Sequence, residues 1–162
     1  MDAHFSAEEH FCRGEAELEA GRHAAALEHF RAAHRLDPTS ARFRSFYGLC
    51  IGLAESRFDR ALELCRTSAK EEFFNPVLYH NLARVHLAFG FKAEAIRYLR
   101  RGLMIDPASA PIRDELARLG VRRRPVLAFL RRRHLLNRWF GRLLRRQLDG
   151  EESGGALEAF RA

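Results

Sequence analysis

Apolar side chains recur every three to four residues through residues 7–119, which is the spacing of one face of an α-helix. In the segment 76–109 this pattern stops near Gly90 and again before Pro107. Glycine favours the turn between two antiparallel helices, and proline ends a helix because it pushes the preceding residue out of the α region. The segment is therefore predicted to form two helices joined by a short turn.

The same hydrophobic pattern occurs twice over 34 residues, in 7–40 and in 76–109. In order along the segment, the matched positions hold Gly14 and Ala83, Gly21 and Gly90, Ala26 and Ala95, Phe30 and Leu99, Ala33 and Gly102, and Pro38 and Pro107. Small residues at a helix crossing let the two helices of a hairpin approach each other closely. Since one hairpin cannot bury its own apolar face, such hairpins are expected to stack into a solenoid.

Residues 41–75 fit between these two segments as a middle hairpin. This segment departs from the pattern by one extra residue before Ala61 and by about three more before Pro76. We therefore expect its second helix to be longer than the others, or bulged near residues 70–74. Residues 110–119 continue the same register and are predicted to form a helix that caps the last hairpin.

Over about residues 7–119 this pattern resembles the tetratricopeptide-repeat (TPR) family, most closely in the third segment. The resemblance implies an all-α fold, a TPR superhelix of three helical hairpins plus a capping helix and a basic C-terminal helix. Residues 1–120 are expected to be the TPR domain. Its repeats are expected at about 7–40, 41–75 and 76–109, followed by the capping helix at 110–119.

In TPR proteins the first helix of each hairpin lines a concave groove, and the resemblance implies which side chains face it. The expected groove residues are Phe11, Glu15, Arg42, Phe46, Leu49, His80, Asn81 and Arg84. The family's chaperone-binding clamp grips a terminal carboxylate with lysine and asparagine of its first repeat. This chain has Phe11 and Glu15 at those two places, so that class of ligand is not expected.

The expected groove has a mixed character that suits a short amphipathic helix or an extended peptide. Its polar members Arg42, Asn81 and Arg84 could hold an acidic side chain of the partner. Its apolar members Phe11, Phe46 and Leu49 would favour an apolar anchor. For Phe11 and Phe46 an alternative stays open, which is ordinary packing between neighbouring repeats.

The formal net charge of +7 is unevenly placed along the chain. Residues 121–148 contain ten arginines and no acid, which leaves 18 Lys+Arg against 21 Asp+Glu elsewhere, a net of −3. The chain is thus a slightly acidic body with a strongly basic appendage. Residues 121–134 are predicted to be a basic linker that includes Arg131, Arg132 and Arg133, and residues 149–162 a flexible tail.

Residues 135–148 have apolar side chains at helical spacing opposite a row of arginines, which predicts a basic amphipathic helix. The prominent side chains are Arg138, Trp139, Phe140, Arg142, Arg145 and Arg146. Three roles stay open: a cap on the last hairpin, a helix on an anionic membrane surface, or a contact with nucleic acid. The C-terminal part also resembles that of a group of bacterial TPR proteins of unsettled function.

No motif for catalysis, metal binding or a cofactor stands out, because H-E-x-x-H, phosphate-loop and G-x-S-x-G patterns are absent. No apolar run reaches the roughly 18–20 residues of a membrane span, and the start lacks a secretory signal. Three cysteines without C-x-x-C spacing, Cys12, Cys50 and Cys65, are interpreted as reduced core thiols of an intracellular protein.

These observations together predict a cytoplasmic, non-enzymatic adaptor that binds a protein or peptide partner in its groove. No small-molecule substrate is expected. The alternative is a peripheral binder of anionic membrane or nucleic acid that acts through the Arg-rich C-terminal helix.

Overall fold

The computed structural model describes residues 5–120, and this part of the chain contains seven α-helices and no strand. The helices are α1 (Ala7–Glu19), α2 (His23–Leu36), α3 (Ala41–Glu55), α4 (Phe58–Glu71), α5 (Pro76–Ala88), α6 (Lys92–Ile105) and α7 (Ala110–Arg118). The predicted basic linker 121–134, basic helix 135–148 and tail 149–162 lie outside the described residues.

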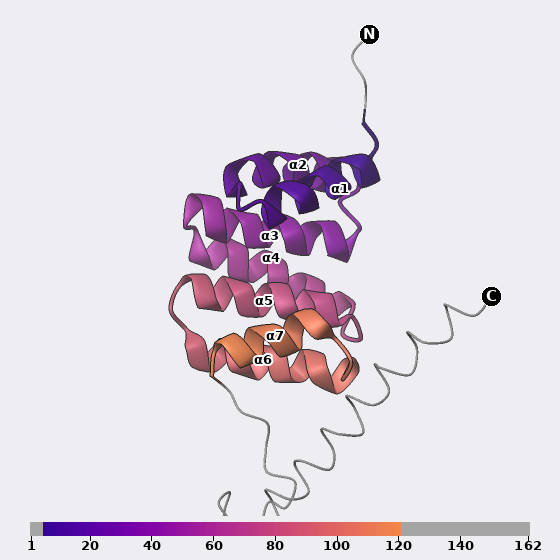
Figure 1. Ribbon diagram of the computed structural model, residues 1–162. Coiled ribbons are helices and arrows are strands. Elements are labelled where there is room, and N and C mark those ends of the chain that lie inside the picture. Colours follow the sequence, from indigo (N-terminus) through magenta and orange to yellow (C-terminus); the bar gives the residue numbers. More distant parts are fainter. Residues whose placement is uncertain (1–4, 121–162) are drawn as a thin grey trace, which may run out of the picture. The chain divides into compact units, whose positions relative to one another are not determined.

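Consecutive helices pack in pairs, α1 with α2, α3 with α4 and α5 with α6, so the described residues form three helical hairpins. Each pair also contacts the next, because α2 packs on α3, α4 packs on α5, and α3 packs on α5. Figure 1 shows the hairpins stacked in chain order, with α7 beside α6 at the far end. The predicted three hairpins and seventh helix are confirmed.

An aromatic cluster joins the first two hairpins. The ring of Phe11 on α1 lies 5.4 Å from Phe30, 5.1 Å from Phe43 and 4.9 Å from Phe46, measured between centroids. Phe30 lies directly against Gly14, where an added Cβ would come within 2.7 Å of the Phe30 ring. The predicted small residue is therefore what lets this large ring fit between α1 and α2.

The turns inside the hairpins contain one residue in the left-handed conformation. Gly21 has a φ of 73° and Gly90 a φ of 80°, so the predicted turn glycines are confirmed. The middle hairpin uses Ser56 instead, with a φ of 55°. This conformation brings the Cβ of an L-residue close to the following carbonyl oxygen, so Ser56 carries a steric cost that glycine avoids.

We expect Ser56→Gly to raise the free energy of unfolding by about 0.5–1 kcal/mol, because it removes the Cβ from a left-handed position. Urea unfolding followed by circular dichroism measures the change. Gly21→Ala is the matched control and should lower stability by a similar amount, since Gly21 has the same kind of conformation. A loss of stability in Ser56→Gly would contradict this account of the turn.

The middle hairpin differs from the others in its first helix, and the prediction of a longer second helix is wrong. Helix α4 has 14 residues, as do α2 and α6, whereas α3 has 15 and both α1 and α5 have 13. Pro76 is the first residue of α5, which agrees with the start of the third segment at residue 76. Asn75 caps that helix by accepting a hydrogen bond from Val77 N at 3.1 Å.

Two of the three cysteines belong to the core. Cys50 and Cys65 are fully buried, and burial raises the pKa of each thiol to about 12. The Cys65 thiol donates to the Ser45 carbonyl at 3.3 Å. Cys12 is exposed on α1, so the interpretation of this residue as a core thiol is wrong.

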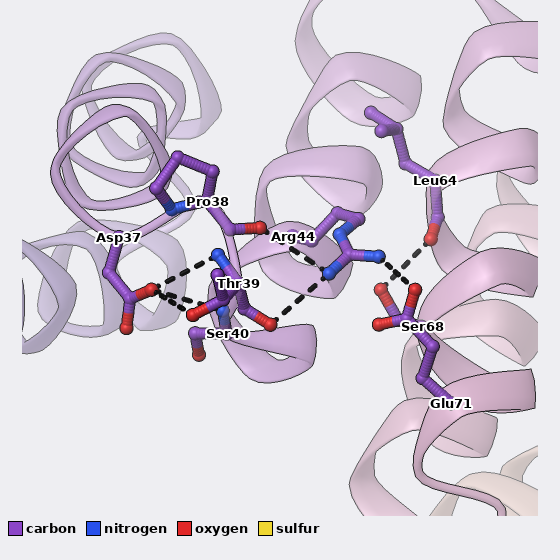
Figure 2. Close-up of polar contacts among 8 residues, drawn as sticks. All are labelled: Asp37, Pro38, Thr39, Ser40, Arg44, Leu64, Ser68 and Glu71. Atoms are coloured by element: carbon purple, nitrogen blue, oxygen red, sulfur yellow. Dashed lines mark hydrogen bonds and ion pairs between the residues drawn. The ribbon is translucent and has the colours of Figure 1, made fainter.

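The linker before α3 is held by side chains on both sides, as Figure 2 shows. Asp37 accepts hydrogen bonds from the backbone and hydroxyl of Thr39 and from the backbone of Ser40. Arg44, whose side chain is only 13% exposed, donates to the Pro38 and Thr39 carbonyls and forms an ion pair with Glu71 at 2.6 Å. One guanidinium thus ties the linker, α3 and the end of α4 together.

We expect Arg44→Met to lower the free energy of unfolding by about 1–2 kcal/mol, because several hydrogen bonds of a mostly buried charge disappear together. Arg60→Met is the matched control, since Arg60 forms an ion pair of similar length with Glu63 on the exposed face of α4. That variant should change stability by less than about 0.5 kcal/mol. Equal effects of the two substitutions would argue against the bridging role of Arg44.

Candidate functional site

The predicted groove residues lie on α1, α3 and α5, the first helices of the three hairpins. Asn81 on α5 is 1% exposed, and its side-chain amide donates to the Ser45 hydroxyl on α3 at 3.2 Å. Buried polar groups require such partners. Asn81 therefore links two neighbouring hairpins inside the protein and presents almost no surface to a ligand.

The three predicted apolar groove residues also lie in the core. Phe11 and Leu49 have no exposed surface, and Phe46 is 8% exposed. Phe11 and Phe46 contact each other across the first two hairpins, which is the inter-repeat packing that the sequence left open as an alternative. The structure therefore assigns these side chains to the interior rather than to a surface that a ligand can reach.

Arg42 is already neutralised within the chain. Its guanidinium lies 3.1 Å from the Glu8 carboxylate and 3.6 Å from that of Glu15, and it covers the Phe11 ring with Cζ 3.9 Å from the centroid. The pKa of Glu15 is raised by burial, which outweighs the opposing effect of Arg42. The negative charges of Glu19 and Glu8 on the same helix also raise the pKa of Glu15. These three glutamates outnumber Arg42, so the α1 end of this face is acidic.

Arg84 occupies the opposite end of the face and is not neutralised. Its side chain is partly buried, and burial lowers the pKa of the guanidinium. Within residues 5–120 it has no ion pair within 4.0 Å and no side-chain hydrogen bond. The neighbouring charges that act on its pKa include Glu115, which raises it, and Arg118, which lowers it.

His80 lies one turn before Arg84 on α5, facing α7. Burial, followed by the charges of Arg84 and Arg118, lowers the pKa of His80 to about 4, so the ring is neutral at physiological pH. Among the described residues its buried Nε2 has no hydrogen-bond partner, and the nearest carboxylate oxygen there, from Glu115, is 3.9 Å away. That same Glu115 oxygen accepts from Arg118 at 3.1 Å.

The pattern of the sequence did not lead to two residues of this site, Glu115 and Arg118. They belong to α7 and follow Asn81 and Arg84 by 34 residues, which is the length of the repeat. The same register that predicted α7 as a cap could therefore have placed them on the same face.

No group of three or more histidine, cysteine, aspartate or glutamate side chains within the described part is arranged to hold a metal ion. None of the helices described here is long and apolar enough to cross a bilayer.

Comparisons with known proteins agree with the architecture. Profiles described as tetratricopeptide repeat match residues 7–40 and residues 76–119. No curated protein matches the chain in sequence.

Several solved structures share the fold at low sequence identity. The first TPR of Spaghetti (RPAP3), bound to the HSP90 peptide SRMEEVD, has 16% identity and a TM-score of 0.55, covering 71% of this chain and 90% of its own. PcrH in complex with the chaperone-binding region of PopB has 23% identity and a TM-score of 0.52, covering 70% and 91%. The Yersinia enterocolitica secretion translocator chaperone SycD has 20% identity and a TM-score of 0.54, covering 70% and 86%.

The same repeat architecture follows from the order of the hairpins, the positions of the turns, the profile matches and these solved structures. Residues 7–40 and 76–119 match the tetratricopeptide repeat, and residues 7–119 have the fold of a TPR superhelix.

Proposed function

We propose that the chain is a non-enzymatic adaptor that binds a partner peptide along the face formed by α1, α3, α5 and α7. The observation that carries this proposal is the charge pattern of the face. Its α1 end is acidic, while its α5–α7 end contains a guanidinium with no acceptor in the described chain. Two proteins of the same fold were solved with bound peptide segments, which supports the same kind of ligand here.

A displayed library of random peptides, selected on the full-length protein, tests this function. Cys12 on α1 and Ala88 on α5 are exposed and follow Glu8 and Arg84 by one helical turn, which places them on this face. Binding of the selected peptides should be lost when bulky side chains are placed there, in Cys12→Trp and Ala88→Trp. Thr67→Trp is the control, because Thr67 is exposed on α4, a second helix of a hairpin. Failure to select any peptide, or equal loss in the control, would overturn the proposal.

The Arg-rich segment 121–148 is proposed to supply a cap or a second contact of this cytoplasmic adaptor. Its ten arginines without an acid support a contact with an anionic surface. Replacing the arginines of 131–146 by glutamine in the full-length protein tests whether anionic vesicles or nucleic acid are bound there. Nucleic-acid binding through roughly six or more phosphates should weaken about 10³-fold between 50 and 200 mM salt.

A further inference from the structure

We propose that Arg84 forms a subsite for one acidic side chain of the bound peptide, an inference that rests on the proposed function. The sequence left three polar candidates for such a contact: Arg42, Asn81 and Arg84. The structure separates them, because Arg42 is paired with Glu8 and Glu15 while Asn81 is buried against Ser45. Of these three, Arg84 alone has no acceptor in the described chain and keeps some exposed surface.

The surroundings of Arg84 make a carboxylate favourable there. The partly buried Arg84 guanidinium has lost part of its hydration without gaining an acceptor from the part of the chain that the structure describes, and that desolvation is what lowers its pKa. A carboxylate on this guanidinium forms charge-assisted hydrogen bonds in a site that is screened less than the open surface. The missing acceptor is thus one that a partner can provide.

The neighbouring groups favour a singly charged carboxylate over a doubly charged phosphate. Arg84 and Arg118 supply two positive charges, Glu115 supplies one negative charge, and the neutral His80 supplies none. The cluster therefore has a net charge of about +1, which one carboxylate cancels. A dianionic phosphate would leave a net negative charge beside Glu115.

This subsite differs in place from a grip on a terminal carboxylate in the first repeat. There the chain has the buried Phe11 and the ion-paired Glu15, neither of which can donate to a carboxylate. The acidic residue of the partner is instead held at the α5–α7 end. The opposite end of the partner faces the glutamates of α1, which favours a peptide with basic residues at that end.

The test uses peptides selected from the displayed library on the full-length protein. They should share an aspartate or glutamate at one position, and its replacement by the amide should weaken binding about tenfold or more. Arg84→Gln should weaken binding of the acidic peptide by a similar factor yet leave the amide peptide nearly unchanged, since both changes break the same contact. A new selection on Arg84→Glu should prefer lysine or arginine at that position.

Arg42→Gln is the matched control, and it should affect the acidic and amide peptides equally. The proposal is overturned if selected peptides bind without a shared acidic position, or if Arg84→Gln weakens both peptides alike. Tighter binding of a phosphoserine peptide than of the glutamate peptide would overturn the choice of a carboxylate. Failure to select any peptide would instead remove the proposed function itself. Urea unfolding of Arg84→Gln confirms that the variant is folded.

Discussion

The Phe11→Ala substitution is expected to lower the free energy of unfolding by about 3–5 kcal/mol. Phe11 has no exposed surface, and its ring lies within 5.4 Å of three other phenylalanine rings. Truncation removes the apolar surface of the ring and leaves a cavity that α1 and α3 cannot fill without moving. Since a domain of this size has a total stability of roughly 5–15 kcal/mol, this one change removes a large part of it.

Urea unfolding of the full-length protein measures this loss, and Glu15→Ala is the comparison. Glu15 lies one turn further along α1, is partly exposed, and pairs with Arg42 at 3.6 Å. Its removal should cost less than about 1 kcal/mol. If Phe11→Ala were equally mild, the ring would be loosely held, and Phe11 would again be a candidate for contact with a partner.

The helices and their turns were predictable because they depend on short-range chemistry. The apolar spacing, the glycines at 21 and 90 and the capping helix all appear in the structure as expected. The middle repeat was misjudged because its extra length was expected in its second helix, whereas its first helix is the longer one. The prolines do not locate the extra length, because Pro38 follows a helix while Pro76 begins one. Proline favours both a position just after a helix and the first turn of the next one, and only the position of Asn75 as a cap distinguishes the two.

The charge pattern of the face was only partly predictable, because it depends on which side chains meet across repeats. Glu8 and Arg42 are 34 residues apart, which places them at the same position of successive hairpins, and the stack brings them to 3.1 Å. The same rule relates Arg84 to Arg118 on α7. Helical spacing shows which residues share a helix face, but the burial of Phe11 also depends on how far its ring reaches toward the next hairpin.

Stability is expected to fall as the pH is lowered from about 6.5 toward 4, and His80 is the largest identified contributor. The pKa of His80 is lowered to about 4 in the folded protein, against an ordinary value near 6.5 in the unfolded chain. Between these two values the unfolded state binds more protons than the folded state, so acid favours unfolding. From His80 alone we expect a loss of about 1.5 kcal/mol between pH 6.5 and pH 5.

Other histidines act in the same direction. His86 is 4% exposed, neither of its ring nitrogens has a hydrogen-bond partner within residues 5–120, and burial lowers its pKa. Burial also lowers the pKa of His34 and His10. Glu15 opposes them slightly, because its raised pKa favours the folded state in acid. The carboxylates whose pKa is lowered, those of Glu9, Glu17 and Asp37, also favour unfolding in acid, from their ordinary values near 4 downward.

Urea unfolding at about pH 7 and about pH 5 tests this prediction, with His80→Gln as the diagnostic variant. The charged groups that face His80 are Arg84 on its own helix and Glu115 and Arg118 on α7. Glutamine retains a polar group at this position but has no proton to gain, so the variant should lose less stability on acidification than the wild type. Identical pH dependence in the two proteins would show that His80 takes up its proton as easily in the folded state as in the unfolded chain. The His80 ring would then gain its proton at its ordinary pKa near 6.5, and the net charge of the α5–α7 cluster would rise above one below that pH.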